Sequence, residues 1–303
     1  MKLSDYEGKF FRVIKDGRFN VLGYPHDEPG IPYICFVESK RYLKYCCRNK
    51  DISCIICKEE LSDDEMLQES KKGIAICKYP RIAFYHMHNY LADHCDDYRG
   101  KFEDNVVGRD CSIHPTAIVA DKGVRIGNNV TIEEYVVIRQ GVTIGNNSVI
   151  RTGAIIGGEN QLVSYDEDCK AFHVHQVGRT YIGNSVEISY YTMVARGVFL
   201  HETTWIDDNV CIEMGSMVGH NVKIGCNSWI GPNCQICGNT NLGENVRMAP
   251  GAIVSNRLKI GNNSNITIGS VVVDNVTEGK KMTGNFAIEH SQYLKWHMKK
   301  LRN

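Results

Sequence analysis

The chain has 303 residues, enough for one large domain or two ordinary ones, and its 35 basic and 35 acidic residues give a formal net charge of zero. That balance supplies no general electrostatic attraction for nucleic acid or for an anionic membrane surface, so neither is expected as a partner. The opening segment MKLSDYEGKFFRVIKDG lacks an apolar stretch of signal-peptide length, and no run of 18 apolar residues occurs anywhere. We therefore expect a soluble cytoplasmic protein with no transmembrane segment.

Residues 1–105 alternate between two kinds of short segment, which is typical of a small α/β domain. The runs FNVLGY, PYICFVE, SCIICK and GIAICK are apolar and of strand length, whereas SKRYLKYCCRN, SDDEMLQESKK and RIAFYHMHNYLADHC have helical spacing. Ser62 and Glu65 predict a capping box for the second helix, and Pro80 predicts the start of the third.

Thirteen cysteines would indicate a disulfide scaffold only in a small secreted chain. Cys54 and Cys57 form a C-x-x-C pattern, for which zinc is one interpretation. In a strand, however, residues three apart point to opposite faces, and no second C-x-x-C or H-x-x-x-H completes a ligand set. Buried free thiols are the preferred interpretation.

From Cys111 onward an aliphatic residue recurs at every sixth position, the signature of a parallel β-helix. One run extends from Ile126 to Ile156, and a second extends from Ile182 to Val272 and includes Leu200. Many of these residues are followed by Gly, as in IGNNVT and IGCNSW, where glycine and asparagine suit tight corners. The number of repeats predicts about eight coils of 18 residues. The period alone does not fix the handedness.

The repeat divides the chain into three predicted parts: residues 1–105, a β-helix at 106–286 and a C-terminal helix at 287–303. The ladder breaks at 158–178, which we expect to leave the coil as a loop lining the binding face; a tolerated surface insertion is the alternative. The tail is basic and amphipathic, and Ile288, Tyr293, Trp296 and Leu301 are expected to pack against the end of the coil. Contact with a phosphate or a carrier protein is the other interpretation of the tail.

His220 stands within this repeat, and an 18-residue coil predicts what lies above and below it. Residues 18 apart stack at about 4.8 Å, which places Glu202 on one side and Gly238 on the other. A base, a carboxylate that orients it and a backbone N–H are the groups that acyl transfer from a thioester requires. The alternative is an exposed corner residue without a role, because Asn128 and Asn262 occupy the same position in other repeats.

His173, His175 and His201 are rival histidines, the first two as candidates for substrate contact. No metal site is expected among them, because no carboxylate completes a ligand set at suitable spacing.

Several motifs resemble the UDP-3-O-acylglucosamine N-acyltransferase family of lipid A synthesis. HQVGRTYIGNSVEIS resembles its Q-x-G-R-x-x-I-G-x-x-V-E-I-G stretch, and VGHNVKIG resembles its catalytic I-A-H-N-V-x-I-G, which places the general base on His220. The family's oxyanion glycine falls on Gly238. FVESKRYLKY resembles its uridine-contacting F-x-x-N-P-K-Y, which implies that Phe36 and Tyr42 hold a nucleotide base. The resemblance further implies a left-handed β-helix and homotrimers with active sites between neighbouring subunits.

Departures from the family pattern fall on the elements that recognise substrates. Ser39 replaces the uridine-binding Asn, and NQLVSY, from Asn160 to Tyr165, replaces the G-F-G-Y loop. Arg257 stands where the family has a second histidine, and the C-terminal extension that meets acyl carrier protein is much shorter. The predicted binding residues are therefore Phe36, Ser39, Tyr42, Asn160, Tyr165, His173, His175, His201 and Arg257.

Together these features predict an N-acyltransferase that moves an acyl group from acyl-CoA or acyl carrier protein to a nucleotide-linked amino sugar, in the biosynthesis of cell-envelope polysaccharide or lipopolysaccharide. His220, Glu202 and Gly238 are its predicted catalytic residues, and no permanently bound cofactor is expected. Three alternatives remain open: the lipid A enzyme itself, a sugar O-acetyltransferase and a scaffold without catalysis.

Overall fold

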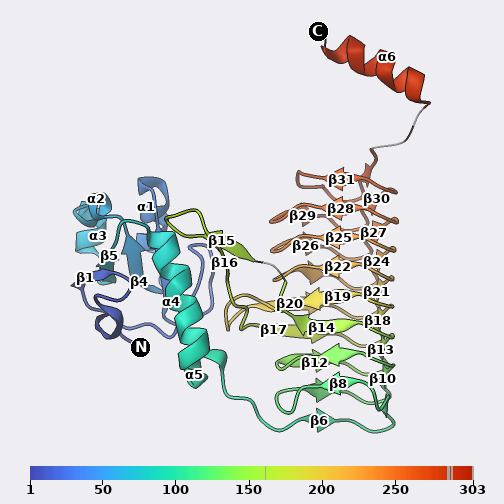
Figure 1. Ribbon diagram of the computed structural model, residues 1–303, viewed down its shortest axis with the longest axis horizontal. Helices are drawn as coiled ribbons and strands as arrows, with labels where there is room; N and C mark the ends of the chain where they lie inside the picture. Colours follow the sequence, from blue (N-terminus) through green and yellow to red (C-terminus); the bar gives the residue numbers. More distant parts are fainter. Residues whose placement is uncertain (161, 285–286, 288, 302–303) are drawn as a thin grey trace.

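The computed structural model describes residues 1–160, 162–284, 287 and 289–301. A small α/β domain lies beside a tall stack of short parallel strands, and the chain passes from one to the other after helix α5 (Asp96–Arg99) (Figure 1). The protein is mainly β, with a parallel β-helix as its larger part, as the six-residue period predicts.

The small domain is built on a five-stranded sheet in the order β1-β5-β4-β3-β2. Its strands are β1 (Arg12–Lys15), β2 (Val21–Leu22), β3 (Tyr33–Val37), β4 (Ile52–Cys57) and β5 (Gly73–Ile76). Four of these strands are the predicted ones and pair in parallel, whereas the unpredicted β1 joins the edge antiparallel to β5.

Each of the three predicted helical segments forms a helix, and three further short helices or turns were not predicted. They are the 3₁₀ turn η1 (Leu3–Tyr6), then α1 (Lys40–Arg48), α2 (Glu59–Ser62), α3 (Glu65–Glu69), α4 (Pro80–His94) and α5. The capping box of Ser62 and Glu65 is wrong, because one helix ends at Ser62 and another begins at Glu65. Asp64 caps the second of these by accepting a hydrogen bond from the Met66 N–H, at 3.1 Å.

The two faces of this sheet bury separate hydrophobic clusters, and the C-x-x-C pair is divided between them. Cys54 packs in the cluster with Phe84, and Cys57 packs in the cluster with Leu43. Both are buried free thiols, and burial raises their pKa values to about 11 and about 12. The thiol interpretation is confirmed.

The β-helix has three faces, which the chain visits in turn. Face 1 consists of β6 (Val106–Val107), β9 (Arg125–Ile126), β12 (Val142–Ile144), β17 (Arg179–Ile182), β20 (Thr203–Ile206), β23 (Lys223–Ile224), β26 (Asn241–Leu242) and β29 (Lys259–Ile260). Face 2 consists of β7 (Ser112–Ile113), β10 (Thr131–Ile132), β13 (Val149–Ile150), β18 (Glu187–Ile188), β21 (Cys211–Ile212), β24 (Trp229–Ile230), β27 (Arg247–Met248), β30 (Asn265–Ile266) and β32 (Lys281–Met282). Face 3 consists of β8 (Ile118–Val119), β11 (Val137–Ile138), β14 (Ile155–Gly158), β19 (Met193–Ala195), β22 (Met217–Val218), β25 (Gln235–Ile236), β28 (Ile253–Val254) and β31 (Val271–Val272).

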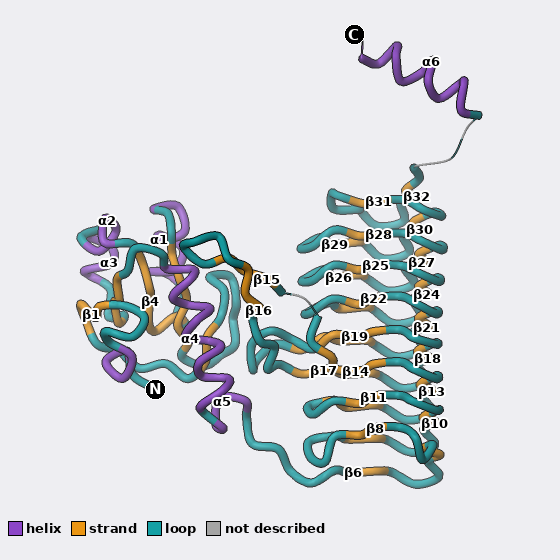
Figure 2. Tube along the Cα trace, in the orientation of Figure 1, coloured by secondary structure: helices purple, strands orange, loops and turns teal. Residues whose placement is uncertain are grey.

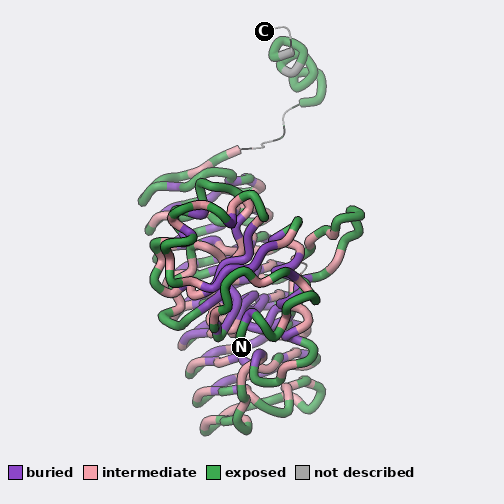
Figure 3. Tube along the Cα trace, turned by 90° about the vertical axis from the view of Figure 1, so that its left-hand side faces the viewer, coloured by how far each residue is buried: buried purple, intermediate pink, exposed green. Residues whose placement is uncertain are grey.

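The register of neighbouring strands reproduces the predicted 18-residue coil. Ile212 lies beside Ile230, and Ile224 lies beside Leu242. The aliphatic residues of the ladder from Ile126 onward, Leu200 excepted, point inward and form one continuous buried core, part of which is visible in Figure 3. At the corners, asparagines such as Asn227 and Asn245 adopt positive φ, which asparagine tolerates better than most residues.

One member of the predicted ladder, Leu200, does not belong to the coil. Ile182 pairs with Ile206, 24 residues away rather than 18, so residues 197–202 leave the coil as a loop. Leu200 packs against the two clusters of the small domain instead. The ladder keeps its phase because this loop has the length of one hexad, which hides it from any count in steps of six.

The longer insertion forms a hairpin that packs on the small domain. Strands β15 (Val163–Tyr165) and β16 (Ala171–His173) pair antiparallel and lie against α4 (Figure 2). The Phe172 ring stacks on His86 at 4.4 Å between ring centres. The hairpin therefore ties the β-helix to α4.

The C-terminal helix α6 (His290–Leu301) does not cover the coil as expected. It lies beyond the last coils, and its described residues are exposed, Tyr293 at 44% and Trp296 at 55% (Figures 1 and 3). Ile288 and the side chain of Leu301 lie outside the described residues. Within the described chain, no helix is both long enough and apolar enough to cross a membrane.

Candidate active site

His220 lies at the corner where the chain turns from face 3 to face 1, two residues after the end of β22. The next residue, Asn221, takes positive φ (57°) and makes the turn. The imidazole is buried, with 8% of the residue exposed, and its Nδ1 has no hydrogen-bond partner among the described residues. A buried ring nitrogen without a partner is costly unless a ligand satisfies it.

Gly238 lies one coil further on, in contact with the His220 ring. A Cβ at Gly238 would lie 2.4 Å from His220 Nε2, so only glycine leaves room for the ring. The Gly238 N–H makes no hydrogen bond within the described chain, whereas Asn239, the next residue, donates to the His220 carbonyl at 2.8 Å. The corner thus presents an imidazole beside an uncommitted backbone donor.

Burial keeps the His220 ring neutral. It lowers the pKa of His220 from 6.5 to about 4, and the positive charge of Arg257 adds to the effect. At neutral pH the imidazole therefore carries a free lone pair that can accept a proton.

Glu202 does not take the predicted position as the orienter of His220. Its carboxylate accepts hydrogen bonds from the backbone N–H groups of Val198 (3.0 Å) and Phe199 (2.9 Å). The residue after His220 is also held by a group other than Glu202, because the Asn221 N–H donates to Thr204 Oγ1 at 2.9 Å. Glu202 ends the 197–202 loop, so its side chain turns back to close that loop instead of reaching the imidazole.

The strand register explains why counting 18 residues back from His220 found only one of the two residues that lie one coil before it. Along face 1, Trp205 pairs with Lys223, which does place Glu202 one coil before His220. Along face 3, Val194 pairs with Val218, which places Arg196 one coil before His220. Two residues occupy the coil position below the histidine because the six-residue loop begins after Arg196 and ends at Glu202.

The small domain contributes two tyrosines to this corner that the sequence did not single out. Tyr24 follows β2, and its hydroxyl lies 3.1 Å from the hydroxyl of Tyr85 on α4. The exposed Arg257, from the coil after Gly238, holds its guanidinium 5.7 Å from the centre of the Tyr24 ring. The only sequence signal for Tyr24 is its place at the end of a predicted strand.

Of the predicted nucleotide-binding residues, Phe36 is connected to this group. Its ring lies 5.0 Å from Phe84 and 6.2 Å from Tyr85, with the Arg81 guanidinium 5.6 Å from its centre. Ser39 is the exposed N-cap residue of α1 and forms no side-chain capping hydrogen bond. Tyr42, in the first turn of α1, is 45% exposed.

Among the predicted loop residues, some side chains form a hydrogen bond or an ion pair and others are exposed. Asn160 accepts a hydrogen bond from the Gln176 side-chain amide at 2.6 Å, and His175 lies 3.2 Å from Asp93 on α4. These contacts explain both residues as ties between the insertion and its surroundings. Tyr165 and His173 are exposed on the hairpin.

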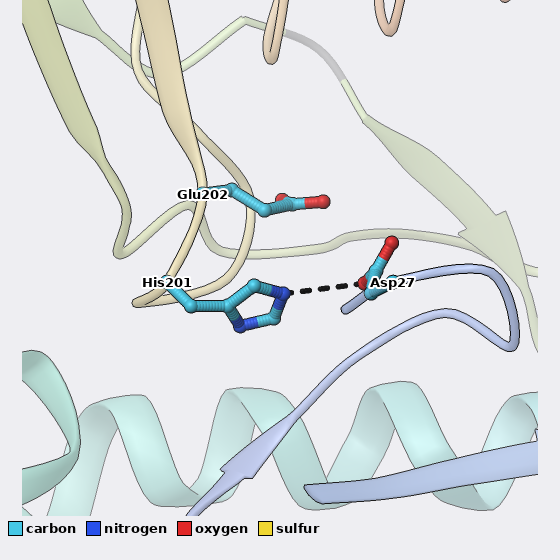
Figure 4. A group of neighbouring side chains, drawn as sticks. All are labelled: Asp27, His201 and Glu202. Atoms are coloured by element: carbon cyan, nitrogen blue, oxygen red, sulfur yellow. Dashed lines mark hydrogen bonds and ion pairs between the residues drawn. The ribbon is translucent and has the colours of Figure 1, made fainter. Parts of the chain in front are cut away.

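His201 belongs to a cluster at the junction of the two domains. Its Nε2 lies 3.3 Å from Asp27 Oδ2, and Glu202 lies beside both (Figure 4). One ligand atom from each of the three residues falls within 4.8 Å of the others. Spacing in the sequence could not reveal this group, because Asp27 is 174 residues from His201.

The comparisons with known proteins bear on the repeat and on the fold. The profile of the family described as "Bacterial transferase hexapeptide (six repeats)" matches residues 123–158 and 221–256. UDP-N-acetylglucosamine acyltransferase from Campylobacter jejuni is similar in structure, with a TM-score of 0.54 and 21% identity over 64% of this chain and 78% of that chain. The likeness supports the predicted left-handed coil, and two stretches of the repeat match the profile of that family.

Two further solved structures are more distant. UDP-N-acetylglucosamine acyltransferase from Arabidopsis has a TM-score of 0.45 and 18% identity over 64% of this chain and 73% of that chain. PerB from Caulobacter crescentus, solved with CoA and GDP-perosamine, has a TM-score of 0.25 and 18% identity over 78% of this chain and 70% of that chain. No curated protein matches the sequence. The resemblance to UDP-3-O-acylglucosamine N-acyltransferases thus stays a prediction.

Proposed function

We propose that this protein is an N-acyltransferase that moves an acyl group from a thioester to the amino group of a nucleotide-linked amino sugar. The observation that carries the proposal is the neutral, buried His220 ring packed on Gly238, with one nitrogen unpartnered and a free backbone N–H beside it. A base next to an oxyanion donor is the arrangement that acyl transfer requires.

In the proposed reaction the sugar amine attacks the thioester carbonyl while the His220 imidazole accepts the amine proton. A C–N bond forms, and the Gly238 N–H stabilises the negative oxygen of the tetrahedral intermediate. The C–S bond then breaks, and His220 returns the proton to the departing thiol of coenzyme A or of a carrier phosphopantetheine. No redox step is involved.

The role proposed for Glu202 differs from the one predicted from the sequence, because its carboxylate is directed at the 197–202 loop. Its carboxylate shapes the 197–202 loop through the Val198 and Phe199 N–H groups and makes no hydrogen bond with His220 among the described contacts. We therefore assign Glu202 as a positioning residue, which supports the wall of the site without touching the reacting atoms.

The acceptor is proposed to lie between the small domain and the corner of the coil. Phe36, Tyr85 and Tyr24 form a continuous line of rings that ends at Arg257, whose charge also acts on His220. Aromatic rings suit a nucleotide base, and a guanidinium suits a phosphate. Ser39 and Tyr42, at the carboxyl end of β3, extend this surface and are proposed to contact the nucleotide.

The proposal includes a homotrimer, and the outer surface of face 3 supports it. Its outward positions form a column in which all but Gln235 are apolar, in the order Ile118, Val137, Ile155, Met193, Met217, Gln235, Ile253 and Val271. Three of them are clearly exposed: Ile118 at 61%, Val271 at 50% and Ile155 at 37%. A sheet that is apolar on both sides is typical of a buried interface.

A mass-spectrometric turnover screen tests the function. UDP- and dTDP-linked amino sugars are crossed with short- and medium-chain acyl-CoAs, because the thirteen cysteines would interfere with a thiol-reactive dye. We expect one acyl group to be added by the wild type and a rate lower by ~10²–10⁴ for His220→Ala. The matched control is His114→Ala, at a partly exposed histidine of the first coil.

Other outcomes would redirect the proposal. Turnover only with a carrier-bound long acyl chain and a lipid-bearing acceptor would restore the lipid A enzyme. Acylation of a sugar hydroxyl would make the protein an O-acyltransferase. Equal turnover by wild type and His220→Ala would remove His220 from the mechanism, and silence with every donor would favour a scaffold.

A further inference from the structure

A cluster of His201, Glu202 and Asp27 joins the two domains, and of the three only Glu202 has a part in the proposed reaction, as a positioning residue. Asp27 lies in the segment between β2 and β3 of the small domain, and the other two residues end the 197–202 loop of the β-helix (Figure 4). The side chains of His201 and Asp27 are largely shielded, at 12% and 20% exposed. Nothing in acyl transfer requires two carboxylates at this junction.

The cluster carries negative charge that the protein does not compensate. Among the described residues, no lysine or arginine forms an ion pair with Asp27 or Glu202. Two shielded carboxylates beside one imidazole repel each other unless a proton or a cation lies between them.

The ligand atoms have the chemistry and the spacing of a metal site. Imidazole nitrogen and carboxylate oxygen are zinc ligands, with bonds of about 2.0–2.2 Å. Two ligands at adjacent corners of a tetrahedron with such bonds lie about 3.3–3.5 Å apart, and His201 Nε2 lies 3.3 Å from Asp27 Oδ2. All three ligand atoms fall within 4.8 Å of one another, so one ion can reach each of them after small side-chain rotations.

Backbone donors already orient both carboxylates. The Tyr24 N–H donates to Asp27 Oδ2 at 2.7 Å. The N–H groups of Val198 and Phe199 both donate to Oε2 of Glu202. Carboxylates that ligate metals are commonly held by such outer hydrogen bonds.

We propose that Asp27, His201 and Glu202 bind one divalent transition-metal ion, zinc by this ligand set, and that the ion clamps the small domain to the 197–202 loop of the β-helix. With three protein ligands, the fourth tetrahedral position is left for water. Because Tyr24 and Phe199 adjoin two of the ligands, the clamp fixes the wall of the corner that holds His220. The proposal concerns binding and does not depend on the proposed acyl transfer.

Equilibrium dialysis of the full chain against zinc chloride, after removal of metal with a chelator, tests the site. We expect one tightly bound zinc per wild-type chain and a dissociation constant at least about 10-fold higher for Asp27→Asn and for His201→Gln. Zinc is also expected to raise the melting temperature of the wild type but not of the variants. His114→Gln, at the surface His114–Glu134 pair, is the matched control and should behave as wild type.

The thirteen cysteines require a separate readout, because thiolates also bind zinc. Replacing zinc by cobalt(II) distinguishes the two cases, since only cysteine ligands give an intense sulfur-to-cobalt absorption in the near ultraviolet. Absence of that band from the tightly bound cobalt supports the site. A strong band, zinc binding that is unchanged in both variants, or no binding at all would overturn it. Circular dichroism confirms that each variant is folded.

Discussion

His220 is buried and lies near a positive charge, and both effects lower the pKa of its imidazole. Taking the imidazolium out of water disfavours it, and the Arg257 guanidinium repels it. The ring gives up some basicity and in return stays in its neutral, proton-accepting form well below neutral pH. For a group proposed to remove a proton from an amine, this is the form that matters.

The pH dependence of activity follows from this shift. If neutral His220 is the base, kcat/KM falls only as the pH drops toward about 4 and is flat from about pH 5 to the neutral range. Arg257→Gln removes the second cause, so its acidic limb should move to higher pH while remaining below 6.5. The readout is a pH–rate profile, with Arg247→Gln on face 2 as the control. A limb at the same pH in both variants would mean that Arg257 does not act on the base.

Gly238 offers a test of the contact between ring and backbone. An alanine Cβ there would lie 2.4 Å from His220 Nε2, so Gly238→Ala must displace the imidazole. The backbone of Gly238 is not in the left-handed region, and a side-chain ring can rotate away, so we expect a folded protein with a rate lower by at least about 10-fold. Steady-state kinetics and the unfolding midpoint measure the two effects.

The matched control for this change is Gly284→Ala, since an added Cβ there meets no atom within 4 Å. A Gly238→Ala enzyme as active as the wild type would show that the ring position is not critical.

At the residue scale, the predicted neighbours of His220 depended on counting along the coil. Gly238 follows His220 through regular coils, so counting 18 residues located it correctly. Glu202 was assigned the wrong contact because a loop precedes it, and a loop of one hexad leaves the ladder unchanged. Tyr24 and Asp27 come from another domain, and no periodic pattern within the β-helix can report a neighbour so distant in sequence.

At the scale of elements, the 197–202 loop is the main connection between the domains at the site. Its Phe199 is fully buried, and the ring makes edge contacts with Tyr24 at 5.0 Å and with His88 at 5.1 Å. Val198 is buried in the same cluster. A short loop thus carries much of the packing that holds the small domain against the coil.

Phe199→Ala should therefore destabilise the junction. Removing a buried phenylalanine costs about 3–5 kcal/mol, because contacts are lost and a cavity is left. We expect the small domain to unfold or detach at a lower denaturant concentration, measured by chemical denaturation together with limited proteolysis of the linker near residue 100. Tyr165→Ala, at a tyrosine that is 60% exposed on the hairpin, is the control. Equal stability of the two variants would contradict the assigned role of the loop.

The element types were largely readable from the sequence, because strand and helix periods are local. Strand β1 was missed because its four residues, RVIK, are mostly exposed at a sheet edge and show no clear alternation. The second predicted helix begins after Asp64 instead of after Ser62, because Asp64 caps it, and a separate short helix, α2, ends at Ser62. Which of two neighbouring residues caps a helix depends on hydrogen bonds, and a hydrophobic pattern does not report them.

At the scale of the whole molecule, the three faces of the β-helix differ in their outer surfaces. Face 1 presents charged residues such as Lys223 and Lys259, and face 2 presents Glu187 and Arg247. Face 3 presents mostly apolar side chains toward solvent and is the exception. Because the inward side of the face 3 strands already packs in the core, this outer column is available only to a partner.

A second copy of the chain is the partner that the proposed trimer supplies, and a single charge on face 3 should prevent its assembly. Met217 lies near the middle of the column and on the strand that leads into His220. Met217→Lys would bury an unpaired ammonium in the interface, a cost of several kcal/mol that a residue exposed in the monomer would not incur. We expect the wild type to sediment with three times the chain mass of 34.2 kDa and the variant to sediment as a monomer with reduced turnover. Trp229→Lys, on face 2, should stay trimeric. A wild type that sediments at the chain mass would instead require the acceptor to be held by the small domain and the coil of one subunit alone.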